Sequence, residues 1–174
     1  GGSFALDEKG DLLCQSSYFN EDLNIVDFGT LEGGTRQIPK KDIEYLNQAL
    51  VLGIRDFVHK IGFKKVHLGL SGVIDSAAVA CLACDALGPQ NVTTIGMPSD
   101  FNSPRSLELA EELAKNLGCE FHKLPIQHSF ESVVSSYEKC FGKKPFSLVH
   151  ENFQARLRGL FLMGYSNEQG SLLI

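Results

Sequence analysis

Two serines and an aspartate follow directly after an apolar run near residue 70. The run Leu68-Gly69-Leu70 leads into Ser71 and Gly72, and Asp75 and Ser76 come shortly afterwards. A strand that ends in such a turn and continues into a helix surrounds the positive end of that helix with backbone N–H groups and hydroxyls. The chemistry that this pattern favours is the binding of a phosphate.

The spacing of this loop separates it from two other phosphate-binding motifs. It lacks the lysine of a Walker loop and the glycine spacing of a Rossmann fingerprint. It is similar instead to SGGxDS, the pyrophosphate loop of the N-type ATP pyrophosphatases. A tight strand-to-helix turn without a ligand is the alternative, but turn chemistry alone explains an aspartate and two serines at these offsets poorly.

One residue of the loop departs from the SGGxDS pattern, because Val73 stands where the second glycine lies. Glycine at that position permits a positive φ and a close approach of the backbone to phosphate, and a β-branched side chain does neither cheaply. If the loop requires a positive φ there, we expect Val73 to be strained by about 1–3 kcal/mol. A different loop geometry and a reduced affinity for ATP are the other readings.

Strands and helices alternate on either side of this loop. Strands are expected at 66–70, 92–97, 120–124 and 171–174, and helices at 75–87, 104–117, 130–140 and 148–166. This alternation is typical of an α/β protein with a parallel, doubly wound sheet that is covered on both faces. Such sheets bind ligands at the carboxyl ends of their strands, where the Ser71 loop and Met97 both fall.

The first 61 residues follow a different pattern. A hairpin is expected from strands at 4–6 and 12–14, with another short strand at 24–28. Residues 29–39 are rich in Gly, Thr and Pro and predict a linker, and an amphipathic helix follows that ends at Gly62. Three short strands are too few to make a domain, so the start of the chain is expected to be the end of something larger. Because the last residues fall inside an apolar strand, the sheet is expected to be incomplete at the C-terminus.

Composition limits the classes of partner. The chain has 43% hydrophobic and 21% charged residues and a formal net charge of −5, which gives no electrostatic reason to expect nucleic acid or an anionic membrane. No apolar run approaches the roughly 20 residues that span a bilayer, and the N-terminus is no signal peptide. We expect a soluble, cytoplasmic protein.

The five cysteines predict reduced thiols rather than disulfides or a zinc site.

A second polar pattern, ENFQARLRG at 151–159, lies in the last predicted helix. Asn152 and Arg156 are four residues apart and therefore share one helical face, with Glu151 and Arg158 on other faces. An amide followed one turn later by a guanidinium suits the recognition of a phosphate or a carboxylate. A solvated polar stripe on a surface helix is the alternative.

These motifs, in this order, closely resemble glutamine-dependent NAD synthetase. A loop like SGGIDSA is followed by a strand that ends in IGMPS, then by a helix like SLELAEELAKNLG, by ENxQARxRG and by a strand that begins at Gly170. The first residues, GGSFALD, resemble the end of the nitrilase-like glutaminase domain of that family. The resemblance implies a glutaminase remnant at 1–28, a linker at 29–39 and, at 40–174, a truncated ATP pyrophosphatase domain of the adenine-nucleotide α-hydrolase-like type.

The resemblance also implies a reaction. The synthetase domain of this family adenylates the nicotinate carboxyl of deamido-NAD with ATP and Mg2+, releasing pyrophosphate, and ammonia then displaces AMP to give NAD. Glutamine supplies the ammonia through a Cys-Glu-Lys triad in the other domain, and none of that triad can be placed in this sequence. We therefore expect the 174 residues to be inactive by themselves.

The site residues that follow from the resemblance form two groups. Asp75 is expected to bind Mg2+, which prefers carboxylate and phosphate oxygens, and Asn152 and Arg156 are expected to contact deamido-NAD. The family binds deamido-NAD at a subunit boundary, so a homodimer or higher homo-oligomer is expected, with the 148–166 helix near the interface. The residues expected to bind ATP are Gly69, Leu70, Ser71, Gly72, Val73, Ile74, Asp75, Ser76 and Met97.

Two other functions stay open at this point. Another ATP pyrophosphatase, such as the GMP synthetase type, has the same kind of loop, although the ENxQARxRG helix speaks against it. A catalytically silent nucleotide-binding fragment is compatible with Val73.

Overall fold

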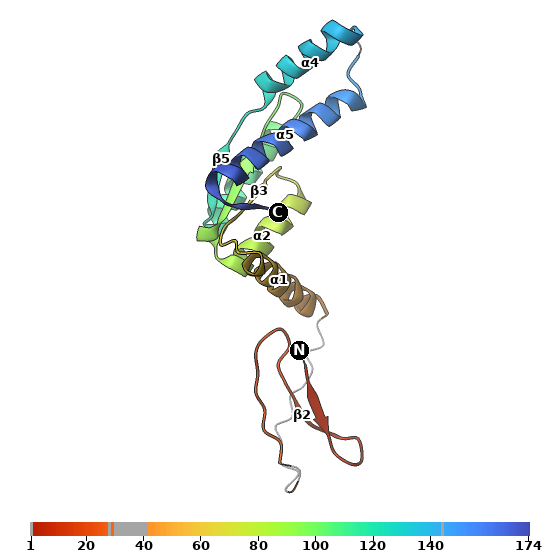
Figure 1. Cartoon of the computed structure of the whole chain (residues 1–174), viewed down its shortest axis with the longest axis vertical. Helices are drawn as coiled ribbons and strands as arrows, with labels where there is room; N and C mark the ends of the chain where they lie inside the picture. The colour runs from red at the N-terminus through yellow and green to blue at the C-terminus, as the bar shows by residue number, and fades with distance from the viewer. Residues whose placement is uncertain (1, 28, 30–41, 144) are drawn as a thin grey trace. The chain divides into compact units, whose positions relative to one another are not determined.

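The computed structural model describes residues 2–27, 29, 42–143 and 145–174 (Figure 1). The chain divides into two compact units, Gly1–Gly53 and Ile54–Ile174, with the boundary inside helix α1 (Asp42–Lys60). The predicted linker at 29–39 lies outside the described residues except for Gly29. The division into a glutaminase remnant, a linker and a synthetase domain therefore stays a prediction.

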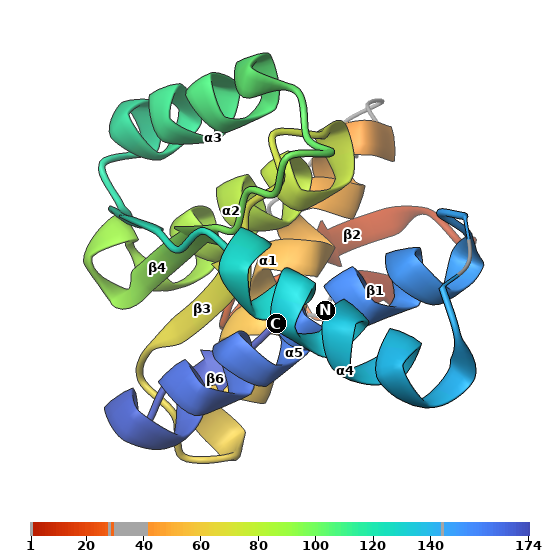
Figure 2. The same ribbon diagram turned by 90° about the horizontal axis from the view of Figure 1, so that it is seen from above.

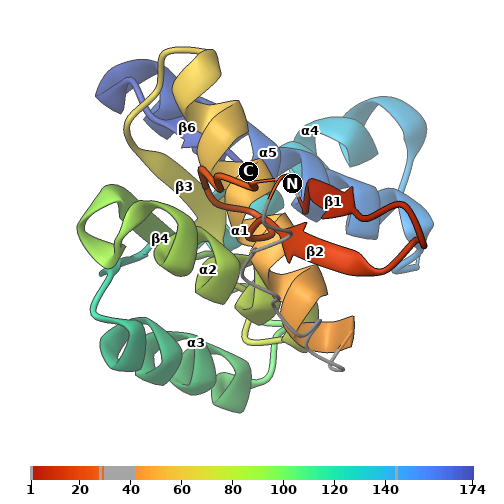
Figure 3. The same ribbon diagram turned by 90° about the horizontal axis from the view of Figure 1, so that it is seen from below.

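The N-terminal unit contains the predicted hairpin. Strands β1 (Phe4–Leu6) and β2 (Leu12–Gln15) pair antiparallel (Figure 3). In the turn, the carboxylate of Asp7 accepts hydrogen bonds from the backbone N–H groups of Lys9 and Asp11, at 2.9 and 2.8 Å. This acidic turn fixes the register of the two strands.

The strand predicted at 24–28 is wrong for its described part. Residues 24–26 have no regular structure and Asp27 makes only an isolated bridge, while Phe28 lies outside the described residues. Of the apolar side chains in the described part of this stretch, Ile25 is 88% exposed and Val26 is half-buried. A strand gains its stability from packing one face against a neighbour, and the exposed Ile25 gains little from such packing.

The C-terminal unit alternates strands and helices as the sequence predicts, with boundaries that differ by a few residues. Its elements after α1 are β3 (Val66–Gly69), α2 (Ile74–Leu87), η1 (Pro89–Asn91), β4 (Val92–Gly96), α3 (Pro104–Leu117), β5 (Glu120–Lys123), α4 (Gln127–Phe141), α5 (Leu148–Gln169) and β6 (Leu172–Leu173). None of the helices in the described part of the chain is long and apolar enough to cross a membrane.

The four strands of this unit form a parallel sheet in the order β5-β4-β3-β6. Helices α2 and α3 cover one face and α5 covers the other (Figure 2), and α4 packs against α5. The strand order reverses at β3, because β4 and β5 follow on one side and β6 returns to the other. Right-handed crossovers then place the helices on opposite faces and leave a crevice at the carboxyl ends of β3 and β6.

Burial explains why these segments form this sheet. Every residue of β4 is buried, as expected of a central strand in a parallel sheet, whereas β5 at the edge is mostly exposed and carries charged residues. The inner side of α2 is made of small residues that let the helix approach the strands closely. These are Ala80, Ala83, Cys84 and Ala86.

His67 is a buried polar side chain of β3 that lies beneath α5. Its Nε2 atom donates to the backbone carbonyl oxygen of Leu162 at 2.9 Å, so Nδ1 of the neutral ring accepts from the Ser171 hydroxyl at 3.0 Å. The side chain is fully buried, and this burial lowers the pKa of His67 below its ordinary value of 6.5. The neutral ring thereby ties β3 to α5 and to the residue before β6.

We expect the protein to lose stability when the pH falls from 7.5 to 5. Because the pKa of His67 is lowered in the folded state, the unfolded chain takes up the proton first. The stabilisation is complete above about pH 6.5 and decreases as the pH falls through the folded pKa, by at most about 1.4 kcal/mol per pH unit. Thermal melting measures this slope. His67→Gln should melt lower at pH 7.5 and show a smaller slope, and an equal slope would exclude His67 as its origin.

Candidate functional site

The predicted phosphate loop is the turn between β3 and α2, so the predicted strand–turn–helix is confirmed. Leu70 extends the strand and donates its N–H to the carbonyl oxygen of Ile95 at 2.9 Å. Helix α2 begins at Ile74, and Val73 at its N-cap offers no side-chain hydrogen bond to the first turn. The N–H groups of that turn are therefore uncapped and available to an anion.

The two serines of the loop are hydrogen-bonded to each other. Their hydroxyl oxygens lie 2.9 Å apart, and the backbone N–H of Ser71 donates to the Oγ atom of Ser76 at 3.2 Å. Ser76 Oγ also donates to the carbonyl oxygen of Val73 at 3.1 Å. These bonds hold the turn in one shape, with Ser71 exposed at its surface.

Gly72 supplies the backbone conformation that the turn needs. Its φ is +76°, in the region that favours glycine. A Cβ atom at this position would lie 2.0 Å from the carbonyl oxygen of Ser106, in the first turn of α3. Both the dihedral angle and the close approach of α3 require glycine here.

The strain expected at Val73 is not present. Val73 has φ −107° and ψ 155°, an extended conformation that any residue adopts. The positive φ of the loop falls one residue earlier, on Gly72. The condition for strain of about 1–3 kcal/mol is therefore not met, and Val73 is accommodated because Gly72 takes the positive φ.

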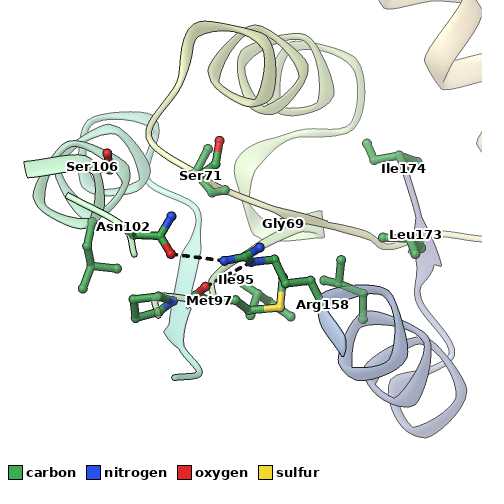
Figure 4. A pocket seen from close by; sticks show the side chains of 13 residues that line it. Gly69, Ser71, Ile95, Met97, Asn102, Ser106, Arg158, Leu173 and Ile174 are labelled. Atoms are coloured by element: carbon green, nitrogen blue, oxygen red, sulfur yellow. Dashed lines mark hydrogen bonds between the residues drawn. The ribbon is translucent and has the colours of Figure 1, made fainter. Parts of the chain in front are cut away.

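A pocket of about 340 Å3 opens beside the loop (Figure 4). It lies at the carboxyl ends of β3, β4 and β6, where the reversal of strand order leaves space. Of the residues predicted to bind ATP, those that line the pocket are Gly69, Leu70, Ser71 and Met97. The other lining residues are Ile95, Pro98, Asn102, Ser106, Leu107, Arg158, Leu162, Leu173 and Ile174.

The remaining predicted ATP residues, 72–76, continue from the pocket lining into the start of α2. Asp75 lies in the first helical turn with an exposed side chain, and no hydrogen bond or ion pair of the described residues involves its carboxylate. The described part of the chain holds no cluster of three or more metal-ligating side chains. A lone exposed carboxylate beside a phosphate-binding turn fits Mg2+, which is held by one or two carboxylates together with phosphate oxygens and water.

Asn152 and Arg156 lie on the exposed face of α5 and do not line the pocket. The same helical face carries Leu160 and Met163, which are 65% and 48% exposed. The structure therefore brings the two predicted deamido-NAD residues together on one face, next to exposed apolar side chains, and away from the pocket. Their role stays a prediction.

Arg158 lines the pocket, although the sequence analysis set it aside. Its Nε atom donates to the carbonyl oxygen of Met97 at 3.3 Å, and its Nη2 atom donates to Asn102 Oδ1 at 3.1 Å and to Gln154 Oε1 at 3.4 Å. The side chain is half-buried, and this burial lowers the pKa of Arg158. The helical repeat could have predicted this position. Gln154 and Leu162 lie four residues before and after Arg158, so all three share the inward face of the helix.

The loop between β4 and α3 is tied to α5 through Ser99. The side-chain oxygen of Asn102 accepts from the backbone N–H of Ser99 at 2.9 Å as well as from Arg158. The hydroxyl of the buried Ser99 lies 2.8 Å from Gln154 Oε1. One wall of the pocket is thus fixed by hydrogen bonds between two segments that are more than 50 residues apart in sequence.

The sheet and the helices that cover it define an α/β domain of the ATP pyrophosphatase fold. The serine turn with its uncapped helix and the pocket lie at the carboxyl edge of this sheet. A family model described as NAD synthase matches residues 46–174. The chain belongs to the NAD synthase family, which confirms the resemblance read from the motifs.

Individual relatives agree with this assignment. A glutamine-dependent NAD(+) synthetase of Synechocystis sp. is 43% identical over 179 residues, which cover 100% of this chain and 32% of that protein. A glutamine-dependent NAD+ synthetase from Acinetobacter baumannii, solved in complex with ADP, superposes with a TM-score of 0.93 at 36% identity, covering 99% of this chain and 34% of that one.

A third relative is described as dependent on NH3 rather than on glutamine. An NH3-dependent NAD synthetase from Campylobacter jejuni, in complex with the nitrate ion, has a TM-score of 0.64 at 32% identity, over 76% of this chain and 56% of that one. The chain spans about one third of the length of the curated relatives that it matches.

Proposed function

We propose that the full-length protein, of which this chain is a part, carries out the ATP-dependent amidation of deamido-NAD to NAD. A nicotinate carboxylate oxygen attacks the α-phosphorus of ATP, which forms an adenylated carboxyl group and releases pyrophosphate. Ammonia, derived from glutamine in the full-length protein, then attacks the carboxyl carbon, and AMP leaves with the transferred oxygen. The observation that carries this proposal is the uncapped α2 turn beside the pocket, in a chain of the NAD synthase family.

The loop supplies what departure of pyrophosphate requires. Charge builds up on the leaving phosphates, and fixed N–H dipoles at the start of α2 stabilise it without reorganising. Gly72 lets the turn lie against α3, so these dipoles are held in place before the nucleotide arrives. Asp75 would hold Mg2+, which neutralises phosphate charge when bound.

The pocket supports the placement of an adenine base. Most of its lining is apolar, with Ile95, Met97 and Leu162 among the side chains, and such a lining suits a flat heterocycle. Its position next to Ser71 would let the phosphates reach the turn while the base stays in the pocket.

The five cysteines are free thiols, which suits a reducing compartment, and we propose a cytoplasmic location.

The reaction is tested with the full-length protein, ATP, deamido-NAD and ammonium chloride. NAD, AMP and pyrophosphate should form in equal amounts, and glutamine should replace ammonium. Deamido-NAD labelled with 18O in the nicotinate carboxylate should transfer one labelled oxygen to the phosphate of AMP. Label that stays out of AMP would exclude the adenylated intermediate.

Two further substrates separate the alternatives. XMP tests the GMP synthetase type, which the family match does not favour, and nicotinate mononucleotide tests whether the adenylyl half of deamido-NAD is recognised. Turnover of XMP but not of deamido-NAD would overturn the proposal. Binding of ATP without turnover of any substrate would favour a silent nucleotide-binding protein.

We also propose that the exposed face of α5 forms a homodimer interface at which Asn152 and Arg156 contact deamido-NAD. The exposure of Leu160 and Met163 beside these two residues supports this placement, since exposed apolar side chains on one helical face favour association. The opposite face packs against the sheet, and among the described residues of the C-terminal unit the face of Leu160 and Met163 is exposed.

The full-length protein is expected to be at least a dimer at micromolar concentration, as measured by light scattering. Leu160→Glu places a charge on the proposed interface and should give monomers with a raised KM for deamido-NAD. Leu109→Glu changes a half-exposed leucine of α3, on the other side of the sheet, and should leave the mass unchanged. A monomeric wild-type protein would contradict the proposal.

A further inference from the structure

Arg158 carries the one ionisable side chain among the described residues that line the pocket. All of its hydrogen bonds are to neutral acceptors, which are the backbone carbonyl of Met97 and the amide oxygens of Asn102 and Gln154. No ion pair of the described residues involves it. A half-buried positive charge thus faces the pocket without an anion beside it (Figure 4).

Such a charge is unfavourable unless something compensates it. Removing a cation from water is costly, and neutral carbonyl groups repay only part of that loss. The three acceptors use the Nε and Nη2 atoms of Arg158, and no hydrogen bond within the described part of the chain uses Nη1. The guanidinium is therefore fixed in orientation and retains two unused N–H donors.

We propose that the free Nη1 edge of Arg158 binds an anionic oxygen of the reacting substrates. A planar guanidinium matches phosphate and carboxylate oxygens, and in this pocket the anion is either the α-phosphate of the nucleotide or the nicotinate carboxylate. The inference rests on the proposed function, because it takes the pocket as the nucleotide site. It adds a binding residue on the inward face of α5, opposite to the face of Asn152 and Arg156.

The competing explanation is that Arg158 only fastens the β4–α3 loop to α5. The two explanations differ in what a neutral replacement does to charged and uncharged ligands. Loss of an anion-binding group weakens only the charged member of a matched ligand pair, whereas a displaced loop weakens both members alike. AMP and adenosine form one such pair, and deamido-NAD and NAD form the other.

The experiment measures binding of these four ligands to the full-length protein by calorimetry. Arg158→Met should weaken one charged member by about 10- to 150-fold and leave its neutral counterpart within about twofold. A selective loss of AMP assigns Arg158 to the phosphate, and a selective loss of deamido-NAD assigns it to the carboxylate. Equal losses within both pairs, or no loss, would overturn the inference.

Three control variants keep the result interpretable. Arg158→Gln is a second neutral variant whose amide can still donate to Met97 or Asn102, and it decides the question if Arg158→Met does not fold. Arg158→Lys restores the charge and should recover part of the selectivity. Asn102→Ala removes one anchor of the loop and of the guanidinium but keeps the cation, so it should weaken the charged ligand less selectively than Arg158→Met does. If the wild-type protein binds none of the four ligands, the proposed function fails, a result distinct from equal losses in a variant.

Discussion

Gly72→Ala should destabilise the protein by about 2–5 kcal/mol and weaken ATP binding by roughly 100-fold or more. The added Cβ atom would meet the Ser106 carbonyl oxygen at 2.0 Å, and the residue would also keep a φ of +76°. The new Cβ atom is fixed to one backbone and meets another, and neither can rotate away as the end of a flexible side chain would. The turn must therefore move away from α3, and the N–H groups at the start of α2 move with it.

Gly118→Ala is the matched control for Gly72→Ala. Gly118 has nearly the same dihedral angle, φ +73°, but a Cβ atom there would meet nothing within 4 Å. We expect it to lose only about 1–2 kcal/mol and to bind ATP as the wild type does. Urea unfolding and calorimetric titration with ATP measure the two effects. Equal behaviour of both variants would mean that contact with α3 does not shape the loop.

Asp75→Ala should lower the rate of amidation by about 100- to 1,000-fold with ammonia and with glutamine alike. The carboxylate is exposed in the first turn of α2, next to the proposed position of the phosphates. In the proposed reaction adenylation precedes the attack of ammonia, so the loss of rate should be the same whichever compound supplies the nitrogen. Initial rates of NAD formation at saturating ammonium and at saturating glutamine provide the comparison.

Asp85→Asn provides the control for Asp75→Ala, since Asp85 is an exposed carboxylate of the same helix near its other end. This variant should keep wild-type rates, which excludes a general effect of negative charge on α2. Raising the Mg2+ concentration should restore little activity to Asp75→Ala. Wild-type rates with ammonia in that variant would remove Asp75 from the proposed role.

Periodicity in the sequence predicted the elements that are regular and well packed. Helix α3 has the predicted bounds because Pro104 begins it, Gly118 follows it, and its apolar residues recur on one face. Strand β4 has the sequence VTTIG, which is rich in β-branched residues, and it is fully buried. The strand expected at 24–28 shows the limit of this reasoning, because a local apolar pattern contains no information about whether a packing partner exists.

The sequence predicted the position of the loop but not its dihedral angles or every residue of the pocket, because these depend on tertiary contacts. The position of the turn follows from the order of apolar and polar residues, but its dihedral angles depend on how α3 packs against Gly72, and this placed the positive φ there rather than on Val73. Arg158 was missed because its partner Met97 is 61 residues away. Contacts of that range are decided by the tertiary fold.

Helix α5 connects the two proposed binding surfaces, since Arg158 lines the pocket and Asn152 and Arg156 lie on the exposed face. If a nucleotide in the pocket shifts this helix, the shift is transmitted to whatever binds its outer face. Thermodynamic reciprocity then applies: a nucleotide that strengthens subunit association tenfold must itself bind tenfold more tightly to the assembled form. Cooperativity between the subunits would then need no separate regulatory domain, only a rigid helix with a ligand on each side.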